Sequence, residues 1–386
     1  MGVACSLFSA RPLFKKKVDF LLHELALRPR QNYWATTALK ALRPRLVDVQ
    51  GDEKGFAADD LAAVLDTIID NYADDDARIT DVSELLFGDD LVAYGARATS
   101  VFNRWADEGG GPSMVAMAAH AIDHFNIPHD HPDVASVLTA ALLAEYPNNL
   151  LYHGNEHYRK VMFHVIRLMV THQALQDEKA IKLSEAQIIQ MLIAAAIHDL
   201  GHEGGDNMRD GIYTPGYMEQ RAVDIARPYF HALDLDRDLL AEIETIVFCT
   251  DITFFAGENS PCVRMRKIYD HFFVGNVTED DIGMMMIGKL RRFDENPALS
   301  MMAMLLHEAD VGSSAGLSYE QSRVETMSIM EERGVMTAGP KMLLAFMTQQ
   351  LNGNMMTPAG NAVFGPAMRT IMEQAAEDIA NGVETF

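Results

Sequence analysis

The chain has 386 residues, 48% of them hydrophobic, which is enough to bury the core of one large domain or of two modest ones. Its 32 lysines and arginines are outnumbered by 55 aspartates and glutamates, giving a formal charge of −23. Because nucleic-acid binding depends on basic side chains, we expect no nucleic-acid partner. A small anionic substrate stays compatible with this charge, since bound cations can reverse the potential inside one pocket.

The chain ends and the cysteines bear on where the protein resides. Cys5, Cys249 and Cys262 are too few and too scattered for a disulfide framework or a thiolate metal site, so we expect a reducing, cytoplasmic environment. No apolar run approaches the ~20 residues of a membrane-spanning helix, and no secretory signal is visible. The first six residues match the short pattern for N-myristoylation at Gly2, with Cys5 open to palmitoylation. Two interpretations remain there: a peripheral membrane anchor, or an accidental match in a disordered end.

Helical periodicity dominates the sequence, and no sustained two-residue alternation appears. Residues 1–75 predict an N-terminal helical extension of unknown role, with a short amphipathic helix near Val18 to Leu27 and a linker at 51–55. A helix over 59–72 carries an apolar stripe suited to packing on the rest of the chain or on a partner. Acidic residues 74–76 mark a boundary, after which 76–386 predicts a second domain. We expect an all-α fold, a compact bundle of about fifteen helices without a sheet, and its oligomeric state stays open.

Three apolar segments end in histidine or aspartate. His153 and His157 are four residues apart, which on a helix places both imidazoles on one face. His198 and Asp199 follow an apolar run, and a third run over 299–306 leads to Asp310. Burying a carboxylate beside an imidazole costs several kcal/mol unless a cation compensates. Nitrogen and oxygen ligands together suit zinc, manganese or magnesium, so these five residues predict a metal site.

The chain has 14 histidines, and a lone histidine is more often a structural residue than a ligand. We assign seven of them to ordinary core or surface positions: His120, His124, His129, His131, His164, His172 and His231.

The similarity of these motifs to a known family extends to the segments around them. They are Phe125-Asn126-Ile127-Pro128, the run 195–204 with Asn207, Thr250-Asp251-Ile252, Ala309-Asp310-Val311 and Ile329-Met330-Glu331-Glu332. Together with the motifs that contain His153, His157, His198, Asp199 and Asp310, these segments resemble the catalytic domain of the class I cyclic-nucleotide phosphodiesterases, within the HD-domain metallohydrolases. The resemblance runs from about residue 80 to the end of the chain.

The resemblance implies a role for each matching residue. His157, His198, Asp199 and Asp310 would hold a tightly bound metal, usually zinc, and Asp199 would bridge to a second metal, magnesium or manganese. Around them, His202, Asn207 and Glu219 would support the metal-bound waters, and His153 would be the general acid. Tyr152, Ile329, Leu343 and Phe346 would contact the substrate. Two such metals activate a hydroxide for attack on a 3′,5′-cyclic nucleotide, and a histidine near neutrality can protonate the leaving 3′-alkoxide.

One departure from the family bears on the substrate. Where the family has a glutamine that grips the purine, this chain has Leu343, although Phe346 fits the aromatic clamp. Leucine cannot make the paired amide hydrogen bonds that identify a base edge. Three functions therefore stay open: hydrolysis of cAMP or cGMP to the 5′-monophosphate, an HD-type hydrolase of another small-molecule phosphoester, and a metal-binding scaffold without turnover.

Overall fold

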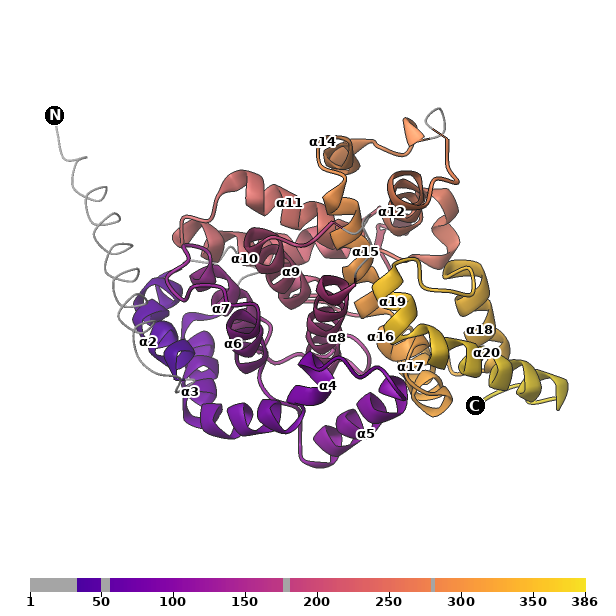
Figure 1. Ribbon diagram of the computed structural model, residues 1–386, viewed down its shortest axis with the longest axis horizontal. Coiled ribbons are helices and arrows are strands. Elements are labelled where there is room, and N and C mark those ends of the chain that lie inside the picture. The colour runs from indigo at the N-terminus through magenta and orange to yellow at the C-terminus, as the bar shows by residue number, and fades with distance from the viewer. Residues whose placement is uncertain (1–32, 50–55, 176–180, 279–281) are drawn as a thin grey trace.

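The computed structural model describes residues 33–49, 56–175, 181–278 and 282–386. Within these ranges the regular secondary structure consists of helices and one short β hairpin (Figure 1). This confirms the all-α prediction and corrects only the expectation that no sheet is present. The acylation pattern, the helix expected near Val18 to Leu27 and the linker at 51–55 lie outside the described residues.

The helices before the hairpin are α2 (Trp34–Val47), α3 (Ala58–Asp81), α4 (Ser83–Phe87), α5 (Tyr94–Asp107), α6 (Met114–His124), α7 (Val134–Leu143), α8 (Asn155–Ala174) and α9 (Glu185–Ile197). The hairpin, β1 (Met208–Arg209) and β2 (Ile212–Tyr213), is followed by α10 (Tyr217–Ala232), α11 (Arg237–Phe248), α12 (Pro261–Tyr269), α14 (Arg292–Glu295), α15 (Ala298–Asp310), α16 (Gly312–Ala315), α17 (Tyr319–Glu332), α18 (Pro340–Ala345), α19 (Pro358–Val363) and α20 (Gly365–Ala380). Short 3₁₀ and π turns lie between them: η1 (Phe254–Asn259), η2 (Asp270–Val274), η3 (Gly288–Arg291) and η4 (Phe346–Gln350).

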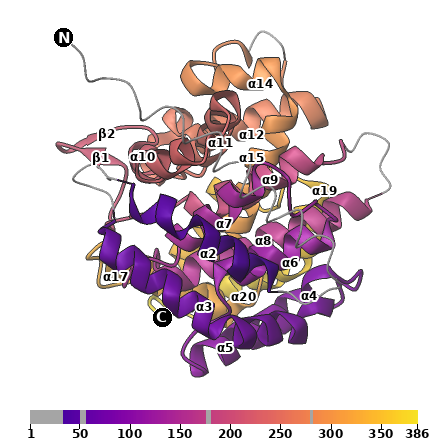
Figure 2. The ribbon, with the colours of Figure 1, turned by 90° about the vertical axis from the view of Figure 1, so that its left-hand side faces the viewer.

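The hairpin pairs Met208 with Tyr213 and projects from the body of the protein beside α10 (Figure 2). Its turn residues, Asp210 and Gly211, have φ values of 53° and 76°. Two successive positive φ values belong to the turn type that joins two-residue hairpins, and the Asp-Gly pair favours that turn. With only two residues in each strand, the alternation that predicts a strand is too short to be seen in the sequence.

The core is built around α8, α9 and α15, which pack against one another. Every residue of α9 from Ile188 to Ile197 is buried, and α9 begins with a capping box in which Ser184 and Gln187 bond to each other's backbone. Every residue of α15 from Ala298 to Ala309 is buried as well. A helix that is apolar on nearly all sides belongs at the centre of a protein, which explains the burial of α9 and α15 along most of their length.

The predicted boundary at residues 75 and 76 falls inside α3, which runs without a break from Ala58 to Asp81. The apolar stripe of α3 is buried at Leu61, Leu65 and Ile68, and the helix packs on α2, α6 and α7. The stripe therefore packs within this chain. The acidic run does not end the helix: Asp74 is exposed, Asp75 is buried, and Asp76 pairs with His120 at 2.7 Å.

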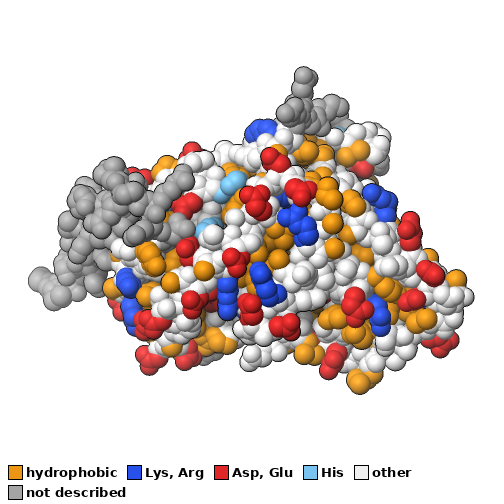
Figure 3. All heavy atoms as spheres, turned by 60° about the horizontal axis from the view of Figure 1, so that its bottom comes forward, with side chains coloured by type: hydrophobic (Ala, Val, Ile, Leu, Met, Phe, Trp, Pro, Cys, Tyr) orange, Lys and Arg blue, Asp and Glu red, His pale blue; other side chains and the backbone are white. Residues whose placement is uncertain are grey.

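The face in Figure 3 carries Lys and Arg side chains interspersed with Asp and Glu, with hydrophobic side chains between them. The excess negative charge of the chain therefore does not make this face uniformly acidic. Among the described helices, none is both long enough and apolar enough to cross a bilayer.

Candidate metal centre

Three central helices deliver the predicted ligands to one place. His157 lies in the first turn of α8, His198 caps the C-terminal end of α9 with Asp199 directly after it, and Asp310 is the last residue of α15. Because the three helices pack together, these ends meet although they are up to 153 residues apart in the sequence, from 157 to 310. The predicted pattern of apolar helices ending in His-Asp and Asp is confirmed.

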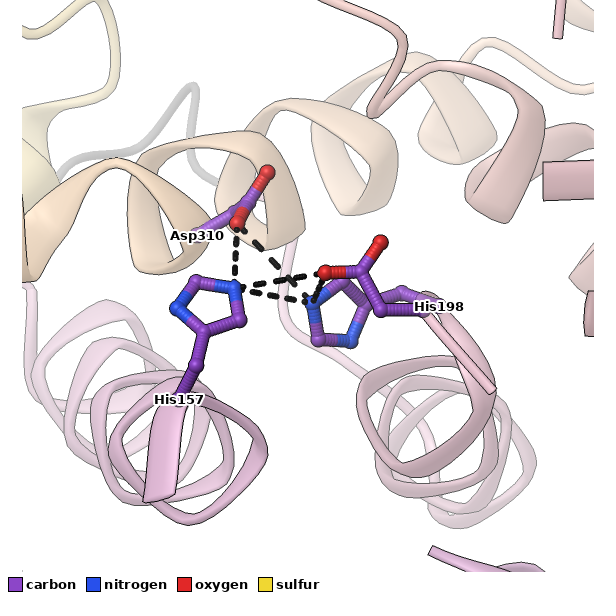
Figure 4. A group of neighbouring side chains, drawn as sticks. His157, His198 and Asp310 are labelled. Atoms are coloured by element: carbon purple, nitrogen blue, oxygen red, sulfur yellow. Dashed lines mark hydrogen bonds and ion pairs between the residues drawn. The ribbon is translucent and has the colours of Figure 1, made fainter. Parts of the chain in front are cut away.

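The four side chains converge on a single point, and Figure 4 shows His157, His198 and Asp310 turned toward one another. Asp310 Oδ1 lies 3.1 Å from His157 Nε2 and 3.8 Å from His198 Nε2. Asp199 Oδ2 lies 3.4 Å from His157 Nε2 and 3.3 Å from His198 Nε2. All four donor atoms are within 4.8 Å of one another, as ligands about 2.0–2.2 Å from one ion must be.

The hydrogen bonds of His198 orient it for metal binding. Its Nδ1 lies 2.9 Å from the carbonyl oxygen of Ala195, and only an Nδ1–H can donate to that oxygen. In the neutral ring, Nε2 therefore carries the lone pair, and Nε2 is the atom that faces Asp199 and Asp310. Metal-binding histidines characteristically donate their second ring N–H in this way.

The charges of the cluster favour a cation. Burial by itself lowers the pKa of His157, but its hydrogen bonds to Asp199 and Asp310 and their charges outweigh burial and raise the pKa to about 10. Conversely, burial raises the pKa of Asp199, yet the two imidazoles hold that pKa well below its ordinary value of 3.8. The carboxylates thus draw positive charge into a buried space, which protons or a divalent ion can supply. The residues present fit a divalent metal ion.

His153 does not share a helical face with His157, contrary to the prediction. Helix α8 begins at Asn155, so His153 lies in the bend before it. The bend is held by Asn155, whose Oδ1 accepts from the backbone N–H of Asn148 at 2.7 Å and whose Nδ2 donates to two carbonyls. Gly154 is needed within it, since a Cβ there would lie 2.5 Å from the carbonyl oxygen of Leu150.

A buried carboxylate holds His153 in place. Glu332, the last residue of α17, accepts from His153 Nδ1 at 2.5 Å and from the backbone N–H groups of Tyr152 and His153 at 3.0 and 3.2 Å. Burial alone would raise the pKa of Glu332, but the bond from His153 outweighs it and lowers the pKa to about 2. Nδ1 of His153 is therefore committed to Glu332, and Nε2 is left to exchange a proton with a ligand. The sequence motif that contains Glu332 does not predict this role, because His153 and Glu332 are 179 positions apart and only the fold brings them together.

His202 lies against His153 with the two rings stacked, their centroids 3.8 Å apart and their planes 18° apart. Its Nδ1 accepts the backbone N–H of Gly204 at 3.0 Å, and burial, followed by the charge of His153, lowers the pKa of His202 to about 4. The donor atoms of His153, His202 and Glu332 also lie within 4.8 Å of one another. Lone pairs lie in the ring plane, however, so two parallel rings cannot both direct theirs at one ion.

Glu219 lies close enough to Asp199 to be affected by its charge, and Asn207 bonds to Glu219. Asn207 Nδ2 donates to Glu219 Oε1 at 3.3 Å, and Asn207 Oδ1 accepts from the backbone of α10. Burial, with the charges of Asp251 and Asp199, raises the pKa of Glu219 well above 4.5. Glu219 Oε2 is buried without a hydrogen-bond partner. An unpaired buried carboxylate oxygen near Asp199 is a position that metal-bound water can satisfy.

Of the residues expected to contact substrate, Tyr152 lies against the cluster. Its ring centroid is 4.7 Å from that of His157, and its hydroxyl lies 3.1 Å from Ser314 Oγ. Leu343 is 1% exposed and packs in the hydrophobic core, while Phe346 and Ile329 are half-buried. Substrate contact by these residues stays a prediction.

The seven histidines assigned to ordinary positions belong to neither donor group among the described residues. No protein-family model matches this chain, and no curated protein matches it.

Proposed function

We propose that this protein is a metal-dependent phosphodiesterase. The observation that carries the proposal is the convergence of two imidazoles and two carboxylates within 4.8 Å, next to a histidine that is oriented by a carboxylate and takes no part in the cluster. Ligands and a separate proton donor are the two parts that phosphoester hydrolysis at a metal requires.

The residues divide the work as follows. His157, His198, Asp199 and Asp310 would hold a divalent ion, and Glu219 and Asn207 would position waters around a second one. When bound, such ions lower the pKa of water and draw charge from phosphoryl oxygens. His153 Nε2 would donate a proton to the leaving oxygen, while Glu332 holds Nδ1 on the other side of the ring. We infer zinc at the four-residue site and magnesium or manganese at the second, since magnesium keeps a shell of waters.

The resemblance to class I cyclic-nucleotide phosphodiesterases supports a 3′,5′-cyclic nucleotide as substrate and the 5′-monophosphate as product. An HD-type hydrolase of a different phosphoester is the second candidate. Leu343 favours it, because the residue in the glutamine position is apolar and buried in the core.

The test is elemental analysis of purified protein together with a turnover screen. Cyclic nucleotides, p-nitrophenyl phosphate and methyl p-nitrophenyl phosphate are each assayed with added Mn²⁺ or Mg²⁺ and after chelation. We expect bound metal and chelator-sensitive hydrolysis of a diester. Turnover of the monoester alone would favour the second candidate, and a metal-loaded protein that hydrolyses none of them would contradict both.

A further inference from the structure

An open cavity of about 570 Å³ adjoins the metal centre. It lies between the end of α5, the bend at 148–155, the first turns of α8 and one face of α17. The metal ligand His157 and its neighbour Tyr152 are part of its wall. The volume is within the ~300–1,000 Å³ typical of small-molecule sites. A molecule in this cavity would therefore lie next to the proposed reaction centre.

A buried ion pair lines the cavity. Lys160, one turn after His157 on α8, donates to Glu325 Oε1 of α17 at 3.0 Å, and Gln321 Nε2 donates to the same oxygen at 2.6 Å. Lys160 is 8% exposed and Glu325 6%. Glu325 Oε2 accepts no hydrogen bond from any residue that the structure describes. Because Glu325 is part of the wall of the open cavity and Oε2 is not among the fully buried unpaired atoms, Oε2 is accessible to N–H or O–H groups of a ligand.

The charges around Lys160 define what the cavity accepts. Lys160 Nζ also pairs with Glu156 at 2.8 Å, so one cation is shared by two carboxylates. The wall also contains Arg159, which pairs with Glu145. A second anionic group on a ligand would meet cations that already have carboxylate partners, and an alkyl chain would meet a buried ion pair. A neutral group rich in hydrogen-bond donors suits both conditions.

Tyr152 connects the cavity to the metal centre. Its ring packs on that of His157, and its hydroxyl lies beside Ser314. Tyr152, His157 and Glu325 all belong to the wall of this one cavity. A ligand can thus span from the metal ligands to Glu325 along Tyr152.

We infer that this cavity, rather than a wall at Leu343 and Phe346, holds the organic part of the phosphoester, and that Glu325 accepts hydrogen bonds from it. The inference rests on the proposed function. The best match is a nucleoside with a guanine-type edge, because guanine offers adjacent N–H donors at N1 and N2 to a carboxylate. Adenine offers only its exocyclic amine there and places a ring acceptor beside it.

The first test blocks the cavity from its rim. Val324 and Met327 lie on α17 and are 42% and 37% exposed, but only Val324 is part of the cavity wall. We expect Val324→Trp to raise the KM for cGMP by about tenfold or more with kcat and metal content retained. Met327→Trp is the matched control and should leave KM unchanged. Methyl p-nitrophenyl phosphate, which has no nucleoside to place, should be hydrolysed equally by both variants.

The second test replaces one carboxylate oxygen of Glu325 with an NH2 donor and leaves the size of the side chain unchanged. Wild-type protein is expected to have a lower KM for cGMP than for cAMP, and Glu325→Gln should reduce that preference by about tenfold, the effect of losing a paired base contact. Direct calorimetric binding of guanosine gives a measurement that needs no turnover, and Val324→Trp should abolish it while Met327→Trp retains it.

The outcomes separate the two proposals. If Val324→Trp behaves like Met327→Trp in both KM and guanosine binding, the cavity is not the substrate site, even where hydrolysis of phosphodiesters proceeds. If no phosphoester is hydrolysed by metal-loaded protein but guanosine binds and Val324→Trp prevents it, the proposed reaction fails and the binding site stands.

Discussion

Two groups of donor atoms lie side by side in this protein, and they are built differently. In the first, His157, His198, Asp199 and Asp310 direct Nε2 and carboxylate oxygens at one point, with side chains at most 13% exposed. In the second, His153, His202 and Glu332 are equally close together, but the rings are stacked and each bonds to a partner of its own.

The difference shows that proximity of donors does not by itself define a metal site. Lone-pair direction and prior hydrogen bonding decide whether donors can share an ion, and here they separate a group that could hold a metal from the group to which we assign a proton donor. The following predictions test that separation.

The largest effect is expected from Asp199→Ala. Asp199 contacts both histidines of the first group, and its removal takes away a ligand and the proposed bridge between two ions. We expect turnover to be abolished and the metal content to fall, as measured by elemental analysis and a phosphodiester assay. Full metal occupancy in this variant would contradict the assignment of the first group.

His153→Ala should separate metal binding from turnover. We expect metal content to be unchanged and turnover to fall by roughly 10²–10⁴-fold, the usual contribution of a general acid to a poor leaving group. With a p-nitrophenolate leaving group, which needs no proton, the loss should be much smaller. If His153→Ala loses as much metal as Asp199→Ala, the two groups are one site and the comparison fails.

A smaller effect is expected from His202, which supports the His153 ring by stacking. Aromatic pairs contribute about 0.5–1.5 kcal/mol, so His202→Ala should lower turnover by roughly two- to tenfold with metal retained. His202→Phe keeps a ring in place and should lose less than the alanine variant. Equal losses in the two variants, or loss of metal in either, would show that His202 acts through its nitrogens instead.

The smallest effect concerns stability and pH. The pKa of Glu332 falls from its ordinary 4.5 to about 2 on folding, so its contribution to stability is present above pH 4.5 and is lost as the pH falls toward 2. Between pH 6 and pH 4 this loss is about 1 kcal/mol. Urea unfolding at the two pH values should show wild-type protein losing about that much more stability than Glu332→Gln. The same pH dependence in both proteins would mean that the carboxylate is not held by His153.

Much of the fold and of the metal centre could be predicted from local pattern. Residues 188–197 are apolar at every position except Gln190, which predicts a buried helix, and a His-Asp pair at the end of such a helix has no ordinary structural reason. The segments of α9 and α15 each end in a possible ligand, and the His153/His157 pair supplies a third segment, so a shared metal site could be expected without knowing how the helices pack.

Other features depended on contacts between distant segments. The bend that removes His153 from α8 is held by Asn155 bonding back to 144–148, and the carboxylate that orients His153 comes from α17. The acidic run at 74–76 predicted a boundary, but α3 continues through it because the adjoining stripe packs on α6 and α7.

The sequence by itself therefore determined the helical class and which side chains can bind a metal, since both follow from residue type and periodicity along one segment. Only the tertiary structure decided that His153, His202 and Glu332 form a separate group, and that Lys160 and Glu325 line a cavity beside His157. Ring orientation, hydrogen-bond partners and cavities arise where elements far apart in the chain meet, and no local pattern carries that information.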